Sequence, residues 1–300
     1  MDRLTGGCEF GCGVFLEVAK RVDEALWDRE ELDLNKRFIA ECVRDGNNRV
    51  KLRGKYAFLR ILHCQEVVSS LFSAMCAVCA MYFAARARGM GGKGKGGGGY
   101  LRGVFWVFVV QGFGWGCSAV FHFRDCYCTQ CFDYFSCVFG ILSVACLSAY
   151  RNRRGFFISV LGSVVFLIFH IWYMVFVEFD FLYNSVACGA ILCGVLTYWS
   201  AWYVRIRRSS HSALLKLSIF GIGVASSFQA IDYGPILFLI DSHALFHILM
   251  LVFSYVLYSF LLADLHLYMD KKRSEKDPKG EVVGCRSGEV IGCRSSEVVA

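Results

Sequence analysis

Residues 155–177 read GFFISVLGSVVFLIFHIWYMVFV and contain no charged side chain. A helix rises about 1.5 Å per residue, so a helix of this length crosses the roughly 30 Å hydrocarbon layer of a bilayer. Arg153 and Arg154 precede the stretch, and Glu178 and Asp180 follow it, so both ends are suited to water. The stretch therefore predicts a transmembrane helix.

Six further apolar stretches of similar length surround this one. The whole chain is 56% hydrophobic and only 19% charged, which is too apolar for an ordinary soluble domain. A soluble core does not bury this many helices that are apolar on every side. The sequence predicts an all-α integral membrane bundle of seven transmembrane helices, at 61–84, 101–122, 131–150, 155–177, 182–204, 213–232 and 244–268.

Basic residues gather in every second connection, while the alternate connections are mostly acidic and carry only Arg124. Basic loops stay on the cytoplasmic side of a membrane, so we expect a cytoplasmic C-terminus and a lumenal N-terminus. The same confinement to loops argues against nucleic acid as the partner behind the net charge of +7. The basic residues of this side lie in these connections, in the first residues of the spans that follow them, and just after the last span: Arg86, Arg88, Lys93, Lys95, Arg102, Arg151, Arg153, Arg154, Arg205, Arg207, Arg208, Lys216, Lys271, Lys272 and Arg273.

Two polar segments flank the predicted membrane domain, 59–268. Residues 1–58 form a short lumenal segment whose three cysteines leave one unpaired. Either the first span exports this segment, or a signal peptide and part of a truncated domain are missing; we favour the second. Residues 269–300 contain GEVVGCRS, GEVIGCRS and SEVVA, repeats too short and polar to bury a core, and predict a disordered cytoplasmic tail.

Five side chains that can carry chemistry fall at the lumenal ends of predicted spans: Ser118, His122, Asp133, His243 and His247. The four-residue offsets from Ser118 to His122 and from His243 to His247 put each pair on one helix face. Three histidines with an open fourth position are typical of catalytic zinc, which activates water at neutral pH. In such a site Asp133 would transfer protons and Ser118 would donate to the developing oxyanion.

Simpler explanations exist for each of these residues taken alone. Ser118 suits close helix packing in a membrane, and Asp133 suits the start of a helix. Glu66, near the start of the first span, is a further candidate, either as a hydrogen-bond partner behind a metal ligand or as a cation ligand itself. The Cys126-x-Cys128-x-x-Cys131 cluster is compatible with metal binding, with disulfides or with no function. Ionisable groups inside a membrane are costly, however, which favours a functional interpretation of the joint pattern.

Three motifs carry a resemblance to a known family: WGCSAVFHFRD at 115–125, TQCFDYF at 129–135 and DSHALFH at 241–247. They resemble the GPI-anchor lipid-remodelling hydrolases of the post-GPI-attachment-to-proteins type. Weaker similarities extend the resemblance over about residues 55–268. That family belongs to a seven-span superfamily with the alkaline ceramidases and adiponectin receptors.

The resemblance implies a zinc ion held by His122, His243 and His247, with Ser118 and Asp133 assisting catalysis. It also implies removal of the sn-2 acyl chain from GPI-anchored proteins in the endoplasmic reticulum or Golgi membrane, a phospholipase A2 type of hydrolysis. Two alternatives stay open. One is a ceramidase-like amidase with the same zinc site, and the other is a non-catalytic seven-span receptor or folding factor whose metal is structural.

Overall fold

A computed structural model of the chain describes residues 58, 61, 64–91, 98–231, 233–236 and 239–276. Within them the fold is all-α, and the strand-like pairings are two isolated bridges, Ile61 with Cys64 and Ile236 with Ile240. The described helices are α3 (Val67–Met90), α4 (Gly98–Phe123), α5 (Tyr127–Ala149), α6 (Arg153–Phe176), α7 (Phe181–Ile206), α8 (Ser212–Ser227) and α9 (Ser242–Lys276).

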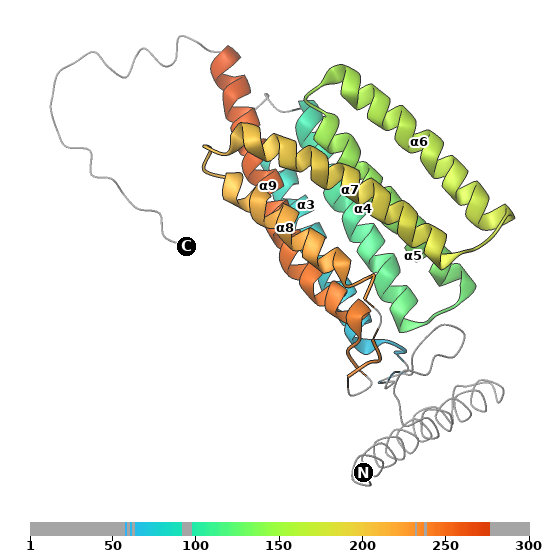
Figure 1. Cartoon of the computed structure of the whole chain (residues 1–300). Coiled ribbons are helices and arrows are strands. Elements are labelled where there is room, and N and C mark those ends of the chain that lie inside the picture. Colours follow the sequence, from blue (N-terminus) through green and yellow to red (C-terminus); the bar gives the residue numbers. More distant parts are fainter. Residues whose placement is uncertain are drawn as a thin grey trace, which may run out of the picture.

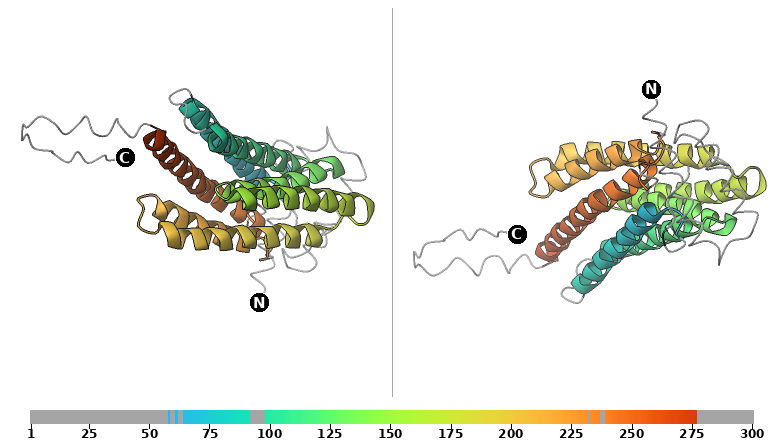
Figure 2. Two further views of the ribbon diagram at one scale, coloured as in Figure 1. Left: turned by 90° about the horizontal axis from the view of Figure 1, so that it is seen from above. Right: turned by 90° about the horizontal axis from the view of Figure 1, so that it is seen from below.

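Successive helices run in alternating directions and form one elongated bundle (Figure 1). Helix α9 packs against α3 and α8, and α4 packs against α3 and α5, as the views from above and below show (Figure 2). In the most apolar stretch of α6 only 6% of the residues are buried, against 39% in the corresponding stretch of α9. Helix α6 therefore lies at the outer edge of the bundle, whereas α9 belongs to its centre.

The outer face of α6 is covered with large apolar side chains. Ile158, Leu161 and Phe176 are 72%, 67% and 75% exposed. Such a surface is unfavourable in water and suits contact with lipid, because lipid tails are as apolar as these side chains. Six helices of the described residues are long and apolar enough to cross a membrane. The chain is therefore a multi-pass membrane protein.

The sixth predicted span, 213–232, is shorter than expected, because α8 contains 16 residues and ends at Ser227. At about 1.5 Å per residue it rises roughly 24 Å, less than the hydrocarbon layer. Phe228, Gln229 and Ala230 instead donate to carbonyls three residues earlier, which tightens and ends the helix. Gly234 and Pro235 then oppose further helix. Residues 226–232, SSFQAID, are also more polar than the rest of the segment, so the span predicted at 213–232 was too long.

Other helix boundaries differ from the sequence prediction by a few residues. Helix α3 begins at Val67 rather than 61, because Gln65 and Glu66 donate their backbone N–H groups to α4 instead. Helix α9 continues to Lys276, beyond the predicted end of the membrane domain at 268. The predicted lumenal segment up to residue 57, with Cys8, Cys12 and Cys42, and the repeats from 280 lie outside the described residues.

Aromatic rings and close helix approaches build the centre of the bundle. Phe83 of α3, Phe108 of α4 and Tyr258 of α9 contact one another with ring centroids 5.2–5.8 Å apart. A Cβ at Gly221 of α8 would collide with the ring of Phe253 of α9. The small residue therefore lets these two helices approach closely, as is common between membrane helices.

A buried polar cluster joins several helices at one end of the bundle. Asp264 of α9 is only 2% exposed. Its Oδ2 accepts from the Tyr100 hydroxyl at 2.6 Å and from Arg151 Nη2 at 2.7 Å. His211 Nε2 lies 3.7 Å from Oδ1. The guanidinium of Arg151 also lies 5.1 Å from the ring centre of Trp202. The cluster therefore connects α4, α7, α9 and the two connections that carry Arg151 and His211.

Candidate metal centre

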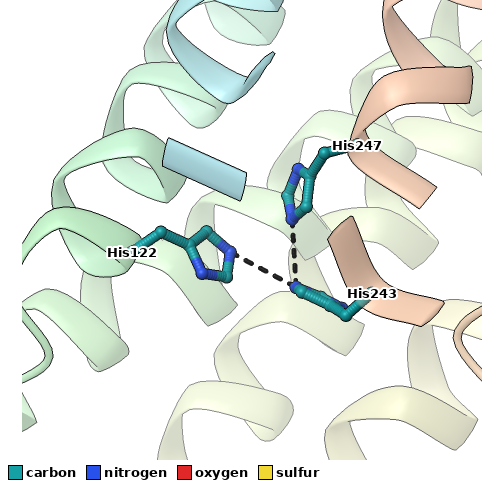
Figure 3. A group of neighbouring side chains, drawn as sticks. All are labelled: His122, His243 and His247. Carbon is teal, nitrogen blue, oxygen red and sulfur yellow. Dashed lines mark hydrogen bonds between the residues drawn. The ribbon is translucent and has the colours of Figure 1, made fainter. Parts of the chain in front are cut away.

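The three histidines singled out in the sequence meet at the opposite end of α9 from Asp264. His122 lies in the last turn of α4, and His243 and His247 lie in the first turns of α9. His122 and His247 are 3% and 2% exposed, whereas His243 is half-buried. Their rings point toward a common point between the two helices (Figure 3). Elements far apart in sequence thus deliver three imidazoles to one place.

The Nε2 atoms of the three rings face one another. His243 Nε2 lies 3.3 Å from His122 Nε2 and 3.0 Å from His247 Nε2. Nitrogen ligands at 2.0–2.1 Å from a zinc ion in tetrahedral geometry are separated by about 3.3 Å. The spacing of the Nε2 atoms is therefore close to that of a three-histidine zinc site.

Each histidine has a different polar partner on its outer nitrogen, Nδ1. Glu66 Oε2 lies 2.6 Å from Nδ1 of His122, and Gln229 Oε1 lies 2.8 Å from Nδ1 of His243. Ser73 Oγ lies 2.9 Å from Nδ1 of His247. Metal-binding histidines usually donate this outer N–H to a carboxylate, carbonyl or other acceptor, which orients the ring. All three rings have that arrangement.

These outer partners determine what the inner nitrogens can bind. A carboxylate and an amide oxygen only accept, so Nδ1 of His122 and of His243 carries the proton in the neutral rings. Their Nε2 atoms then present lone pairs toward each other at 3.3 Å. Two facing lone pairs repel, and a shared cation removes the repulsion. The three histidines therefore fit a metal ion, and they are the single group of this kind among the described residues.

The Glu66–His122 contact is fixed by the backbone as well as by the side chains. The Glu66 N–H donates to the His122 carbonyl at 3.0 Å, and the Gln65 N–H donates to the Phe123 carbonyl at 3.1 Å. One turn further, the Ser70 hydroxyl donates to the Ala119 carbonyl at 2.9 Å. The start of α3 is thus tied to the end of α4, and this holds the Glu66 carboxylate beside His122.

Asp241 fixes the start of α9, from which His243 and His247 project. Its Oδ1 accepts from the backbone N–H of Ala244 at 2.7 Å, as a helix N-cap does. Burial raises the pKa of the Asp241 carboxyl, while the hydrogen bond from Ala244 opposes the rise. The cap stabilises the first turn of α9 and with it the relative position of the two histidines.

Ser118 lies beside the histidines but reaches them through another residue. It is 6% exposed and sits one turn before His122 in α4. The hydroxyl of Ser73, from α3, lies 3.4 Å from Ser118 Oγ and contacts His247 as described above. Ser118 is thus connected to the histidine cluster through Ser73, and its role as an oxyanion donor stays a prediction.

The other predicted groups of this region lie in α5 and just before it. Asp133 is half-buried in the second turn of α5. Its catalytic role stays a prediction. Cys126, Cys128 and Cys131 are free thiols, and they form no metal-holding group within the described part of the chain.

Ser73 and Gln229 are site residues that the sequence analysis missed. Ser73 lies seven residues, or two turns, after Glu66 and faces the same side of α3. A polar residue at that spacing inside an apolar span was an available signal. Gln229 had no such signal, because its position depends on the early end of α8. Glu66, by contrast, was correctly identified as a candidate outer partner.

Comparison with known proteins agrees with the motifs around the histidines. A model of the Per1-like family matches residues 34–265, which include every residue of the centre. The chain belongs to the Per1-like family. Its matches include a Xenopus tropicalis protein named "GPI-specific phospholipase A2-like PGAP3", 27% identical over 248 residues that make up 80% of this chain and 77% of the relative.

Two further relatives are similar to this chain. The human protein with the same name is 26% identical over 240 residues, covering 78% of this chain and 74% of the relative. The Drosophila melanogaster "Post-GPI attachment to proteins factor 3" is 30% identical over 205 residues, covering 65% of this chain and 61% of the relative. The similarity to Per1-like proteins thus extends over most of the membrane domain. It agrees with the family resemblance in the sequence.

Proposed function

We propose that this Per1-like protein is a zinc-dependent lipid hydrolase of the phospholipase A2 type, which removes the sn-2 acyl chain from GPI-anchored proteins. The observation that carries the proposal is the convergence of three Nε2 atoms, each on a ring held from behind by Glu66, Gln229 or Ser73. The names of the relatives supply the substrate class, since they describe GPI-specific phospholipase A2-like proteins.

The chemistry follows from the residues around the centre. His122, His243 and His247 would hold the zinc ion, which when bound supplies Lewis acidity to activate water and polarise an ester carbonyl. The Ser118 hydroxyl donates to the oxygen of the ester carbonyl as negative charge develops on it. Asp133 accepts a proton from the attacking water and returns it to the departing glycerol oxygen, so fatty acid and lyso-lipid are the products.

The arrangement of charges supports a lumenal active site in the endoplasmic reticulum or Golgi membrane, with the C-terminus in the cytoplasm. Arg86 and Arg88 lie near the end of α3, and Arg153 and Arg154 begin α6, all away from the histidines. Lys271 lies near the far end of α9 from His243. Basic ends stay cytoplasmic, which leaves the histidines on the lumenal side. In this topology α8, although short, is the sixth of seven spans.

Hydrolysis by the purified protein tests the function directly. The full chain in lipid nanodiscs is mixed with a GPI-anchored reporter whose sn-2 acyl chain is labelled. We expect labelled fatty acid and lyso-GPI as products, with the rate lost on treatment with a zinc chelator and restored by added zinc. Ceramide offered in parallel is expected to release no sphingosine.

Three results would change this conclusion. Sphingosine release without fatty acid release would favour the ceramidase-like amidase. Fatty acid release that survives complete removal of zinc would separate the reaction from the metal. A zinc-loaded protein that hydrolyses neither substrate would favour the non-catalytic receptor or folding factor.

Replacing Glu66 with glutamine tests the outer partner of His122. The amide keeps an oxygen that accepts from Nδ1, but it removes the negative charge that strengthens His122 as a ligand. We expect zinc affinity to fall by about 10-fold, the low end of the usual effect of an outer partner. Competition with a chromophoric zinc chelator measures the affinity. Glu178→Gln, the same change at an exposed carboxylate, is expected to bind zinc as the unchanged protein does.

A further inference from the structure

Ser73 contacts two different groups of the site. It is fully buried in α3, with its hydroxyl oxygen 2.9 Å from His247 Nδ1 and 3.4 Å from Ser118 Oγ. The two contacts come from α9 and α4, so this one hydroxyl lies where three helices meet. No other described residue is placed to connect His247 with Ser118 through a single side chain in this way.

The chemistry of these groups fixes the direction of the hydrogen bonds. His247 turns Nε2 toward His243 Nε2, so a ring that binds metal there carries its proton on Nδ1. That N–H donates to the Ser73 oxygen. A hydroxyl has a single proton, and the Ser73 proton points to the oxygen of Ser118. Ser118 thereby accepts from Ser73 and keeps its own proton for another acceptor.

We propose that Ser73 is a positioning residue that holds His247 as a metal ligand and orients the Ser118 hydroxyl as a donor. The hydrogen bonds are all donated in one direction: from His247 to Ser73, and from Ser73 to Ser118. The Ser118 hydroxyl then donates to the carbonyl oxygen of the substrate. The 3.4 Å step is longer than a typical O–H···O bond of about 2.7–2.8 Å. Such contacts commonly shorten when substrate binds. The part that concerns Ser118 rests on the proposed hydrolase function, whereas the part that concerns His247 does not.

Ser69 offers a matched control for a test by substitution. It lies one turn before Ser73 in the same helix and is 1% exposed. Its Oγ has no hydrogen-bond partner within the described residues. Ser73→Ala and Ser69→Ala therefore remove the same atom from equally buried positions of α3, and only the first removes the proposed contacts.

Zinc affinity and steady-state kinetics are measured for both variants and for Ser118→Ala. We expect Ser73→Ala to bind zinc about 10-fold more weakly, as loss of an outer partner does. At saturating zinc its kcat is expected to fall while KM changes little, because Ser118 acts on the transition state. Ser69→Ala is expected to match the unchanged protein in zinc affinity and in kcat, and Ser118→Ala is expected to keep the zinc affinity.

The double substitution Ser73→Ala with Ser118→Ala shows whether Ser73 acts on catalysis through Ser118 or whether the two residues act independently. If Ser73 acts on catalysis through Ser118, then at saturating zinc Ser73→Ala lowers kcat much less when Ser118 is already alanine. An equal loss of kcat in both backgrounds overturns the link to Ser118. Unchanged zinc affinity in Ser73→Ala overturns the link to His247. If the unchanged protein binds zinc but hydrolyses no lipid, the proposed function fails, and the zinc titration still decides the role of Ser73 at His247.

Discussion

Replacement of His243 by alanine is expected to remove zinc binding and hydrolysis together. His122, His243 and His247 form the triad of candidate metal ligands. His243 is its central member, because its Nε2 lies 3.3 Å from that of His122 and 3.0 Å from that of His247. Without it two nitrogens remain, which is fewer than a catalytic zinc site uses. The loss of affinity should exceed the roughly 10–100-fold effect of losing an outer partner. Elemental analysis of the purified variant and the acyl-release assay measure the two effects.

His266 supplies the control for this substitution. It lies in the same helix, α9, but its side chain is exposed and it is far along the helix from the triad. His266→Ala is expected to keep the zinc content and the rate of the unchanged protein. A folded His243→Ala protein with a full complement of zinc and normal hydrolysis would show that the reaction depends on some other centre.

The sequence predicted the helical membrane character well but the helix ends less well. Long apolar runs report which segments prefer lipid, and six of the seven correspond to helices of membrane length. The prediction of a span at 213–232 was too long because composition does not mark the end of a helix, which here comes where Phe228 and its neighbours change their hydrogen bonding. At α3 the backbone of Glu66 pairs with α4 instead of extending the helix. The first departure is a local change of hydrogen bonding and the second is a contact between two helices, and composition encodes neither.

The same departures build part of the candidate site, which is why the sequence predicted it incompletely. The four-residue spacing of His243 and His247 predicted a shared face, and the triad forms as expected. Gln229 reaches His243 because α8 ends early, and Glu66 reaches His122 because α3 starts late. Regular helix in either segment would turn these side chains elsewhere. The irregular ends of α8 and α3 therefore supply two of the three outer partners.

Replacement of Asp264 by alanine is expected to destabilise the bundle while it leaves the metal site intact. Asp264 accepts from Tyr100 and Arg151, and its removal leaves a buried hydroxyl and a partly buried guanidinium without their acceptor. Breaking a buried ion pair by removing one partner costs about 3–5 kcal/mol. We expect the lower end of this range, because the Arg151 side chain is 39% exposed and water compensates part of the loss. Thermal unfolding in detergent measures the effect.

Asp270 provides the comparison, since it lies in the same helix close to the same end and is exposed. Asp270→Ala is expected to unfold at the temperature of the unchanged protein. The helix rises about 1.5 Å per residue, so Asp264 lies roughly 25 Å along α9 from His247. Asp264→Ala that remains folded should therefore keep its zinc affinity. Unchanged stability would mean that Arg151 finds other partners among the rings of Tyr100, Trp202 and Tyr268. Loss of zinc from the folded variant would instead mean that the two ends of α9 are coupled.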